Sequence, residues 1–229
     1  MLSTKRAVPW LLAALFLILT TLPVCAATKA DDEQTISNAS AVLQAMLASN
    51  QVPASVLEKA DCVIVLPGVK KFAVGVGGSA GRGPMSCRSG ENFSGKWSPP
   101  AIYTIAGASA GLQVGGSSTD YVLLLMAPKA VEAVVKGKSK IGSDVTAAAG
   151  PSGSTASTGT GADVLTYARA KGLFAGVSLD GSTLDPDSEA NQRLYDKPTS
   201  IHAIVRDNGV KPTSAGQALM TELDSKLAK

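Results

Sequence analysis

The sequence predicts an α+β protein with a curved, mainly antiparallel, glycine-rich β-sheet, barrel-like or sandwich-like, and flanking helices at both ends. Apolar residues follow helical spacing near the two ends of the chain and alternate with small or polar residues between them. In residues 72–77 (FAVGVG) bulky side chains alternate with alanine and glycine, so one face of this strand is nearly bare. Glycine weakens a strand unless the backbone bends or a partner approaches closely, so the pattern indicates a tightly curved sheet or a ligand groove.

The first 26 residues have the pattern of a secretory signal peptide. Lys5 and Arg6 precede an apolar run over residues 11–22, and residues 24–26 (VCA) form a small-residue cleavage site. The apolar run is too short to span a bilayer. We therefore expect export to the periplasm or secretion. Lipid attachment at Cys25 is the less favoured alternative, because the valine before it is not the small residue that normally precedes a lipidated cysteine.

The charge balance of the remaining chain excludes a nucleic-acid footprint. Removing Lys5 and Arg6 from the 21 basic residues leaves 19 against 18 acidic residues, a net charge of +1. Proteins that bind nucleic acid carry a basic excess, so we expect no nucleic-acid partner. Any basic surface must be local.

The first elements after the leader are helical. A polar stretch, residues 28–33, precedes an amphipathic pattern over residues 36–47, and residues 54–60 are expected to form a second, short helix. The polar face of the first helix carries no lysine or arginine, whereas helices that insert into a membrane surface usually do. Core packing is therefore favoured over membrane insertion for this helix.

The middle of the chain has the composition of strands. Six segments are predicted to form them: residues 62–66, 72–79, 85–88, 101–106, 111–115 and 121–126. Pro67 and Gly68 are expected to end the first of these strands in a turn. Residues 121–126 (YVLLLM) are apolar throughout, so we expect them in the interior of the sheet.

The C-terminal part alternates between helices and strands. Helices are predicted from Pro128 to about Gly137, from Asp185 to about Tyr195, and from a capping box at Ser214 onwards. Residues 141–149, 154–161, 164–169 and 173–179 are the expected strands. The Ser/Thr/Gly-rich segment 154–161 also fits a linker, but its alternation favours one strand of a hairpin.

Cysteine and histidine are too few for a metal centre. Cys62 and Cys87 remain after the leader, and an even pair in an oxidising compartment favours a disulfide over two buried free thiols. A zinc site wants four nitrogen or sulfur ligands, but His202 is the only histidine. We expect neither a metal nor a cofactor.

Five segments of the chain together resemble the SYLF domain, a family of lipid-binding modules. They read ADCVIVLPGVKKFAVGVGGSAGRGPMSCR, KWSPPAIYTIAGASAGLQVGGSSTDYVLLLM, KIGSDVTAAAGPSG, YARAKGLFAGVSLDG and NQRLY, in the order of the family. The resemblance implies a lipid-binding domain over residues 27–196, with residues 197–229 as a C-terminal extension containing one helix. It also implies anionic phospholipid as the ligand. Ser154 stands at a position that is often basic in the family, which leaves the lipid head group open.

The basic residues nearest the glycine-rich strands are the expected phosphate contacts. They are Lys70, Lys71, Arg82, Arg88 and Lys96. Arginine and lysine bind phosphate as a planar fork and as a point charge respectively, and turns would place them along a basic rim of the sheet. An ordinary solvated rim is the alternative.

Three aromatic residues are candidates for apolar contact with a membrane. They are Phe72, Phe93 and Trp97, with Trp97 preferred because indole favours the membrane interface. A surface that binds an envelope protein instead of lipid is the competing interpretation of this region.

Two short motifs invite enzymatic or nucleotide-binding interpretations. Residues 107–111 (GASAG) match the GxSxG pattern of a serine hydrolase, with Ser109 as nucleophile and Asp120 and His202 as partners. That pattern requires a helix after the serine, but the sequence that follows is glycine-rich and strand-like. Residues 75–80 fit the loosest dinucleotide pattern, again without a following helix. We therefore favour non-catalytic binding, and keep the hydrolase as the minor alternative.

Overall fold

The computed structural model describes residues 27–74, 76–90, 92–110, 115–151, 161–170, 173–174, 179 and 181–227. Within these residues nine strands form one sheet in the order β5-β9-β3-β2-β1-β4-β7-β6, and β8 pairs with β7. The strands are β1 (Cys62–Val74), β2 (Val76–Cys87), β3 (Ala101–Ala110), β4 (Gly115–Leu125), β5 (Ser139–Lys140), β6 (Ala147–Ala149), β7 (Val164–Ala170), β8 (Leu173–Phe174) and β9 (Thr183–Pro186). The β6–β7 pair is parallel, and the other pairs are antiparallel.

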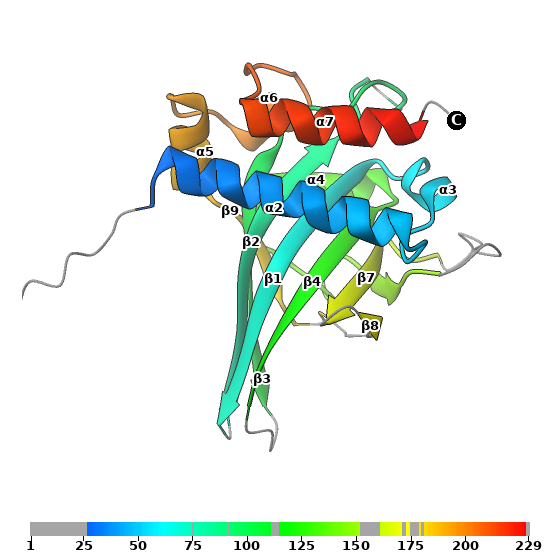
Figure 1. Cartoon of the computed structure of the whole chain (residues 1–229), viewed down its shortest axis with the longest axis vertical. Helices are drawn as coiled ribbons and strands as arrows, with labels where there is room; N and C mark the ends of the chain where they lie inside the picture. Colours follow the sequence, from blue (N-terminus) through cyan, green and yellow to red (C-terminus); the bar gives the residue numbers. More distant parts are fainter. Residues whose placement is uncertain are drawn as a thin grey trace, which may run out of the picture.

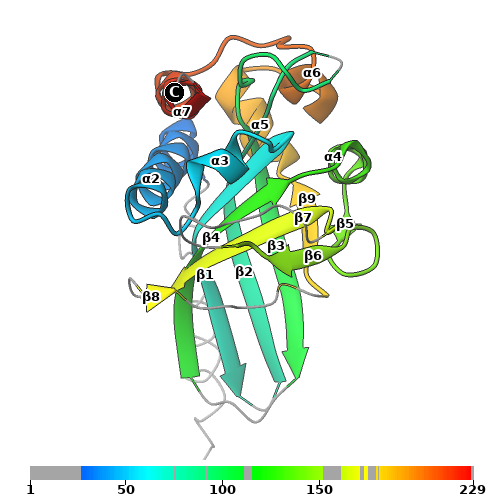
Figure 2. The ribbon, with the colours of Figure 1, turned by 90° about the vertical axis from the view of Figure 1, so that its right-hand side faces the viewer.

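The helices gather around one end of the sheet. They are α2 (Lys29–Ala48), α3 (Ala54–Leu57), α4 (Pro128–Lys136), α5 (Ser188–Tyr195), α6 (Ile201–Val205) and α7 (Ser214–Leu227). Figure 1 shows α2 and α7 side by side across this end, while the far ends of β1 to β4 extend beyond the helices. Figure 2 shows β7 crossing in front of the long strands, so the sheet curls into a half-barrel. The predicted α+β class with a curved, mainly antiparallel sheet and flanking helices is confirmed.

Strand β1 continues through the dipeptide that was expected to end it. Pro67 and Gly68 form an irregularity at which the pairing with β4 shifts between Leu66 and Val69. Gly68 has a φ of +59°, which favours glycine, and its amide donates a hydrogen bond to Asp120 at 2.8 Å. The predicted turn at Pro67–Gly68 is therefore wrong. A bulge inside the strand satisfies the same residue preferences.

Two glycines of β2, Gly81 and Gly83, lie where the neighbouring strand packs closely against the backbone. A Cβ atom on Gly83 would lie 1.9 Å from the carbonyl oxygen of Val65, and one on Gly81 would lie 2.7 Å from a methyl group of Val69. Both glycines belong to β2 and both contacts come from β1, on either side of the bulge. Glycine therefore lets the two strands bend against each other, as expected for a tightly curved sheet.

The core lies between the helices and the upper part of the sheet. Residues 121–125 of β4 are fully buried, as their apolar sequence predicts. At the same end Cys62 of β1 lies opposite Cys87 of β2, and a disulfide joins the two buried cysteines. The disulfide fastens the strand ends on which α2 and α3 pack.

Several helix boundaries differ from the sequence prediction. The polar stretch 28–33 is the first turn of α2, because Thr28 and Asp31 form a reciprocal capping box. Helix α5 is capped by Asp187 instead of Asp185, because β9 still includes Pro186. The cap of α7 is Thr213, whose hydroxyl accepts a hydrogen bond from Gly216.

One predicted C-terminal strand is shorter in the structure, and one helix was missed. Only residues 147–149 of the predicted strand 141–149 form β6, and residues 173–174 of the predicted strand 173–179 form β8, while residues 175–178 lie outside the described part. Helix α6 follows a Ser200 cap that the sequence analysis did not identify. The predicted leader 1–26 and residues 154–160 of the expected strand 154–161 lie outside the described residues.

Candidate functional site

A groove of about 490 Å³ lies between α2 and the bulge of β1. It is lined by Thr35, Asn38, Ala41, Val42, Pro67, Gly68, Lys70, Arg82 and Asp120. Two of the predicted phosphate contacts, Lys70 and Arg82, therefore lie in one depression of the surface. We call this depression the α2 groove.

The alternation of β1 and β4 decides which side chains enter the α2 groove. Lys70 lies opposite Ser118 of β4, and its Nζ donates a hydrogen bond to the Ser118 hydroxyl at 3.2 Å. Asp120 follows two residues later on the same face and pairs with Arg169 of β7 at 3.0 Å. Residues i and i+2 of a strand share a face, so the three strands β1, β4 and β7 present one charged surface toward α2.

The wall of the groove is held by a buried carboxylate. Asp32 of α2 is completely buried and accepts hydrogen bonds from Arg82 of β2 and from Arg193 of α5. The Arg193 Nε lies 2.8 Å from the carboxylate, and this hydrogen bond raises the pKa of Arg193. A buried carboxylate needs such partners because desolvation disfavours its charge. Arg82 therefore fastens α2 to the sheet, a structural role that the sequence analysis did not foresee.

The charges around the α2 groove sum to a positive excess. The residues that line it include two cations, Lys70 and Arg82, and one carboxylate, Asp120, which leaves the lining with a charge of +1. Arg82 is paired with Asp32 and Asp120 with Arg169, so Lys70 is the one lining cation without a carboxylate partner among the described residues. An anion that enters this groove meets a favourable field.

Lys71 lies on the opposite face of the sheet from Lys70. Its Nζ lies 5.7 Å from the centre of the Tyr121 ring, and burial lowers the pKa of Lys71. Tyr121 is fully buried, and burial raises its pKa to about 12. The adjacent lysines therefore do not act on one surface.

Arg88 and Lys96 lie neither in the α2 groove nor on the face of Lys71, but in the loop between β2 and β3. Arg88 donates hydrogen bonds to the carbonyl oxygens of Glu58, Ser94 and Gly95, the shortest of them 2.7 Å to Glu58. These bonds shape the loop, so the guanidinium of Arg88 is largely engaged within the protein. Lys96 is exposed on the same loop. The single basic rim predicted from the sequence is thus divided among three places.

The preferred membrane contact, Trp97, is buried. Its side chain is 1% exposed and belongs to the core, so the prediction that it meets a membrane interface is wrong for this structure. The backbone pairing of Trp97 with Arg88 closes the loop and turns the ring inward. Phe93 is partly buried and packs against the core, while the side chain of Phe72 lies outside what the structure describes.

The geometry around Ser109 differs from that of a hydrolase. Ser109 lies within β3 opposite Gly77, and the next described element is strand β4, so no strand–turn–helix elbow is seen in the described residues. The side chain of Ser109 lies outside the described part. Its supposed partners are engaged elsewhere, because His202 pairs with Asp207 at 3.1 Å and Asp120 pairs with Arg169.

The described residues contain neither a metal-binding cluster nor a helix that could span a membrane. No group of three or more histidine, cysteine, aspartate and glutamate side chains is arranged to hold a metal ion. No described helix is long and apolar enough to cross a membrane.

One signal for the α2 groove was present in the sequence. Asp32, Ile36, Ala39 and Leu43 follow one another at spacings of four, three and four, so the carboxylate stands on the apolar face of α2. A charged residue in such a stripe indicates a buried ion pair. Its partners, Arg82 and Arg193, are 50 and 161 residues away, so no local pattern could identify them.

Comparison with known proteins identifies the family. Residues 106–226 match the family described as "Ysc84: Las17-binding protein actin regulator". Protein YSC84 of Saccharomyces cerevisiae is 34% identical over 203 residues, which cover 82% of this chain and 42% of that protein. The human SH3 domain-containing YSC84-like protein 1 is 35% identical over 180 residues, covering 76% of this chain and 51% of that protein.

A third relative extends the same result. LAS seventeen-binding protein 3 of Saccharomyces cerevisiae is 33% identical over 186 residues, which cover 78% of this chain and 39% of that protein. The chain thus spans about half the length, or less, of the curated relatives it matches. Family match and identity together show that the chain belongs to the Ysc84 family, the family of SYLF domains that its sequence resembles.

Proposed function

We propose that this protein binds anionic phospholipid at a membrane surface without catalysing a reaction, and that the α2 groove receives the head group. The observation that carries the proposal is the exposed ammonium group of Lys70, which has no carboxylate partner among the described residues, in an open groove whose lining carries a charge of +1. The SYLF resemblance adds the expectation of a lipid ligand.

The groove offers contacts of the kind that a phosphate requires. Lys70 is exposed and has no carboxylate partner among the described residues, so its ammonium group is available to an anion. Asn38 lines the opposite wall on α2 and adds an uncharged amide donor, whereas the hydroxyl of the adjacent Thr35 already donates to the carbonyl oxygen of Asp31. Arg82 and Arg193 affect the electrostatic potential of the groove but are not expected to contact the phosphate, because Asp32 already pairs with their guanidinium groups. Each basic residue near an anionic surface contributes about 1 kcal/mol, so binding of the single domain is expected to be weak and sensitive to salt.

The setting of this activity is also a proposal. The leader pattern of residues 1–26 favours export, so the lipid would be an anionic phospholipid of the cell envelope. Peripheral association with that membrane would follow from the groove alone.

A protein partner is the second candidate. The relatives' names describe Las17 binding and actin regulation, so members of this family include proteins that bind other proteins. In this chain the same charged groove would then receive an acidic segment of an envelope protein.

Sedimentation with vesicles tests the first proposal against the second. Residues 27–229, which contain every described element, are mixed with phosphatidylglycerol or phosphatidylcholine vesicles at low and at high salt. We expect binding to the anionic vesicles alone, and loss of binding at high salt. Equal binding to both vesicle types, or none to either, would contradict the lipid proposal. The latter result would leave an acidic protein segment as the ligand to seek.

A further inference from the structure

A second pocket lies between α4 and α6, across the sheet from the α2 groove. Its volume is about 280 Å³, and it is lined by Phe93, Pro128, Val131, Glu132, Val135, His202 and Arg206. Figure 2 shows α4 and α2 on opposite sides of the molecule. We call this cavity the α4 pocket.

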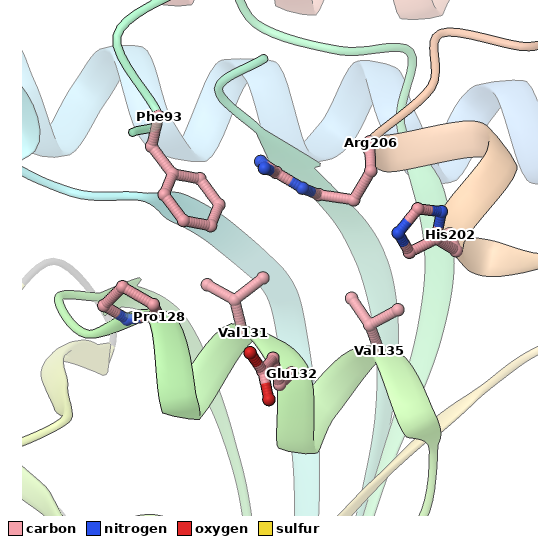
Figure 3. Close-up of a pocket in the computed structure, with 7 residues that line it drawn as sticks. All are labelled: Phe93, Pro128, Val131, Glu132, Val135, His202 and Arg206. Atoms are coloured by element: carbon pink, nitrogen blue, oxygen red, sulfur yellow. The ribbon is translucent and has the colours of Figure 1, made fainter. Parts of the chain in front are cut away.

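One wall of the α4 pocket is apolar. Pro128, Val131 and Val135 recur at spacings of three and four, so they lie along one face of α4. Figure 3 shows both valines pointing into the pocket, with Phe93 above them. Val131 is 3% exposed and Val135 is partly buried, so this wall is a continuation of the core. An apolar group placed there would be removed from water.

The facing wall carries the guanidinium group of Arg206. It lies 3.9 Å from the centre of the Phe93 ring and donates hydrogen bonds to the carbonyl oxygens of Arg88 and Gly90 at 2.8 and 2.9 Å. These bonds use two of the five N–H donors of an arginine. Arg206 forms no ion pair with a carboxylate of the described residues, and the nearby Asp61 is half-buried, which raises the pKa of its carboxyl group. Arg206 therefore brings unused donors and a positive charge without a direct ion-pair partner to the pocket.

The acidic groups at the rim already have partners within the protein. Glu132 lies 3.9 Å from Lys136, and its side chain is 71% exposed. Asp207 pairs with His202 at 3.1 Å. The α4 pocket thus combines an apolar wall with one fixed cation, and both of these carboxylates are engaged by neighbouring side chains.

We propose that the α4 pocket binds a small monocarboxylate with an apolar tail, of the medium-chain fatty acid class. The carboxylate meets the planar fork of Arg206, which matches its geometry, and the chain lies along Val131 and Val135. A volume of about 280 Å³ holds roughly nine groups the size of a water molecule. That is the size of octanoate. This site is separate from the α2 groove and does not depend on phospholipid binding.

A titration with three probes of equal chain length tests the charge requirement. Amide NMR spectra of residues 27–229 are recorded with sodium octanoate, with octanol and with octyltrimethylammonium, all below micelle formation. We expect octanoate to shift signals of α4, α6 and the 88–97 loop with a Kd of about 1 mM. Octanol should bind at least about fivefold more weakly, and the cation should leave these signals unchanged. Equal shifts with all three probes, or none with octanoate, would overturn the proposal.

Two variants and one control test the place of binding. Val135→Trp fills the pocket and should weaken octanoate binding at least about tenfold. Arg206→Lys keeps the charge but loses the planar fork, and should weaken it about threefold. Ala54→Trp, at an exposed position of α3, adds the same bulk elsewhere and should change nothing. A folded Val135→Trp protein that binds octanoate as the parent does would overturn the assignment. Should that variant not fold, parent-like binding by Arg206→Lys would do so.

Discussion

Lys70 and Lys71 are neighbours in the sequence, but they belong to different regions of the molecule. Lys70 is exposed beside the α2 groove, whereas Lys71 is half-buried on the opposite face with its ammonium group near Tyr121. Burial lowers the pKa of Lys71. The difference shows that consecutive basic residues of a strand lie on opposite faces of the sheet, here one exposed at the groove and one half-buried near Tyr121.

A second contrast lies within the α2 groove itself. Among the described residues, Lys70 has only the Ser118 hydroxyl as partner, while Arg82 is bound to the buried Asp32. A cation that holds the fold together cannot be removed without damage to the groove. Lys70 is therefore the residue on which binding is best tested, and Arg82 and Arg88 are not.

The largest effect is expected from removing the carboxylate that holds the groove. Asp32→Ala leaves Arg82 and Arg193 without their shared partner. Losing one side of a buried ion pair costs about 3–5 kcal/mol, and we expect the lower end because the two arginines remain 31% and 27% exposed. Urea unfolding followed by circular dichroism measures the change. Glu33→Ala is the matched control on the next residue, and equal stability of the two variants would show that Asp32 does not hold α2.

Alkaline pH should destabilise the protein, because its buried tyrosines resist ionisation while the fold is intact. Burial raises the pKa of Tyr121 and of Tyr167 to about 12, and it also raises the pKa of Tyr103 and Tyr195. Above pH 10 the unfolded chain loses tyrosine protons that the folded protein keeps, so the free energy of unfolding falls as the pH rises. We expect tyrosinate absorbance to appear together with the loss of helix signal. Tyrosine ionisation near pH 10 in the folded protein would argue against this burial.

The smallest effect is expected at Trp97. The chain has two tryptophans, Trp10 and Trp97, so residues 27–229 contain one fluorescent indole. Because Trp97 is 1% exposed, its emission maximum should stay the same when anionic vesicles bind. A blue shift on binding would mean that the 88–97 loop opens and inserts the ring into lipid.

The fold was predictable where local patterns decide it. The apolar run 121–125 forms the buried strand β4, and the helical spacing after residue 36 marks α2. The bulge at Pro67–Gly68 was not predictable, because the same dipeptide also fits a turn, and the choice depends on Asp120, 52 residues later, accepting the Gly68 amide. Turn and bulge residues carry the same local preference.

The candidate site was predictable only in part. Basic residues near the glycine-rich strands did include Lys70 and Arg82, which line the α2 groove. Their grouping with Lys71, Arg88 and Lys96 failed because a sequence does not show which face of a strand, or which loop, receives a side chain. Long-range partners such as Asp32 with Arg193 decide which cations remain available, and they follow from the tertiary structure alone.

Comparing Lys70→Ala with Lys71→Ala on phosphatidylglycerol vesicles at low salt tests the central claim most directly. A basic residue near an anionic surface contributes about 1 kcal/mol, so Lys70→Ala should bind about fivefold more weakly than the parent. Lys71→Ala, which removes a cation from the opposite face, should bind within about twofold of the parent. Equal losses for the two variants, or a larger loss for Lys71→Ala, would contradict the assignment of phospholipid binding to the α2 groove.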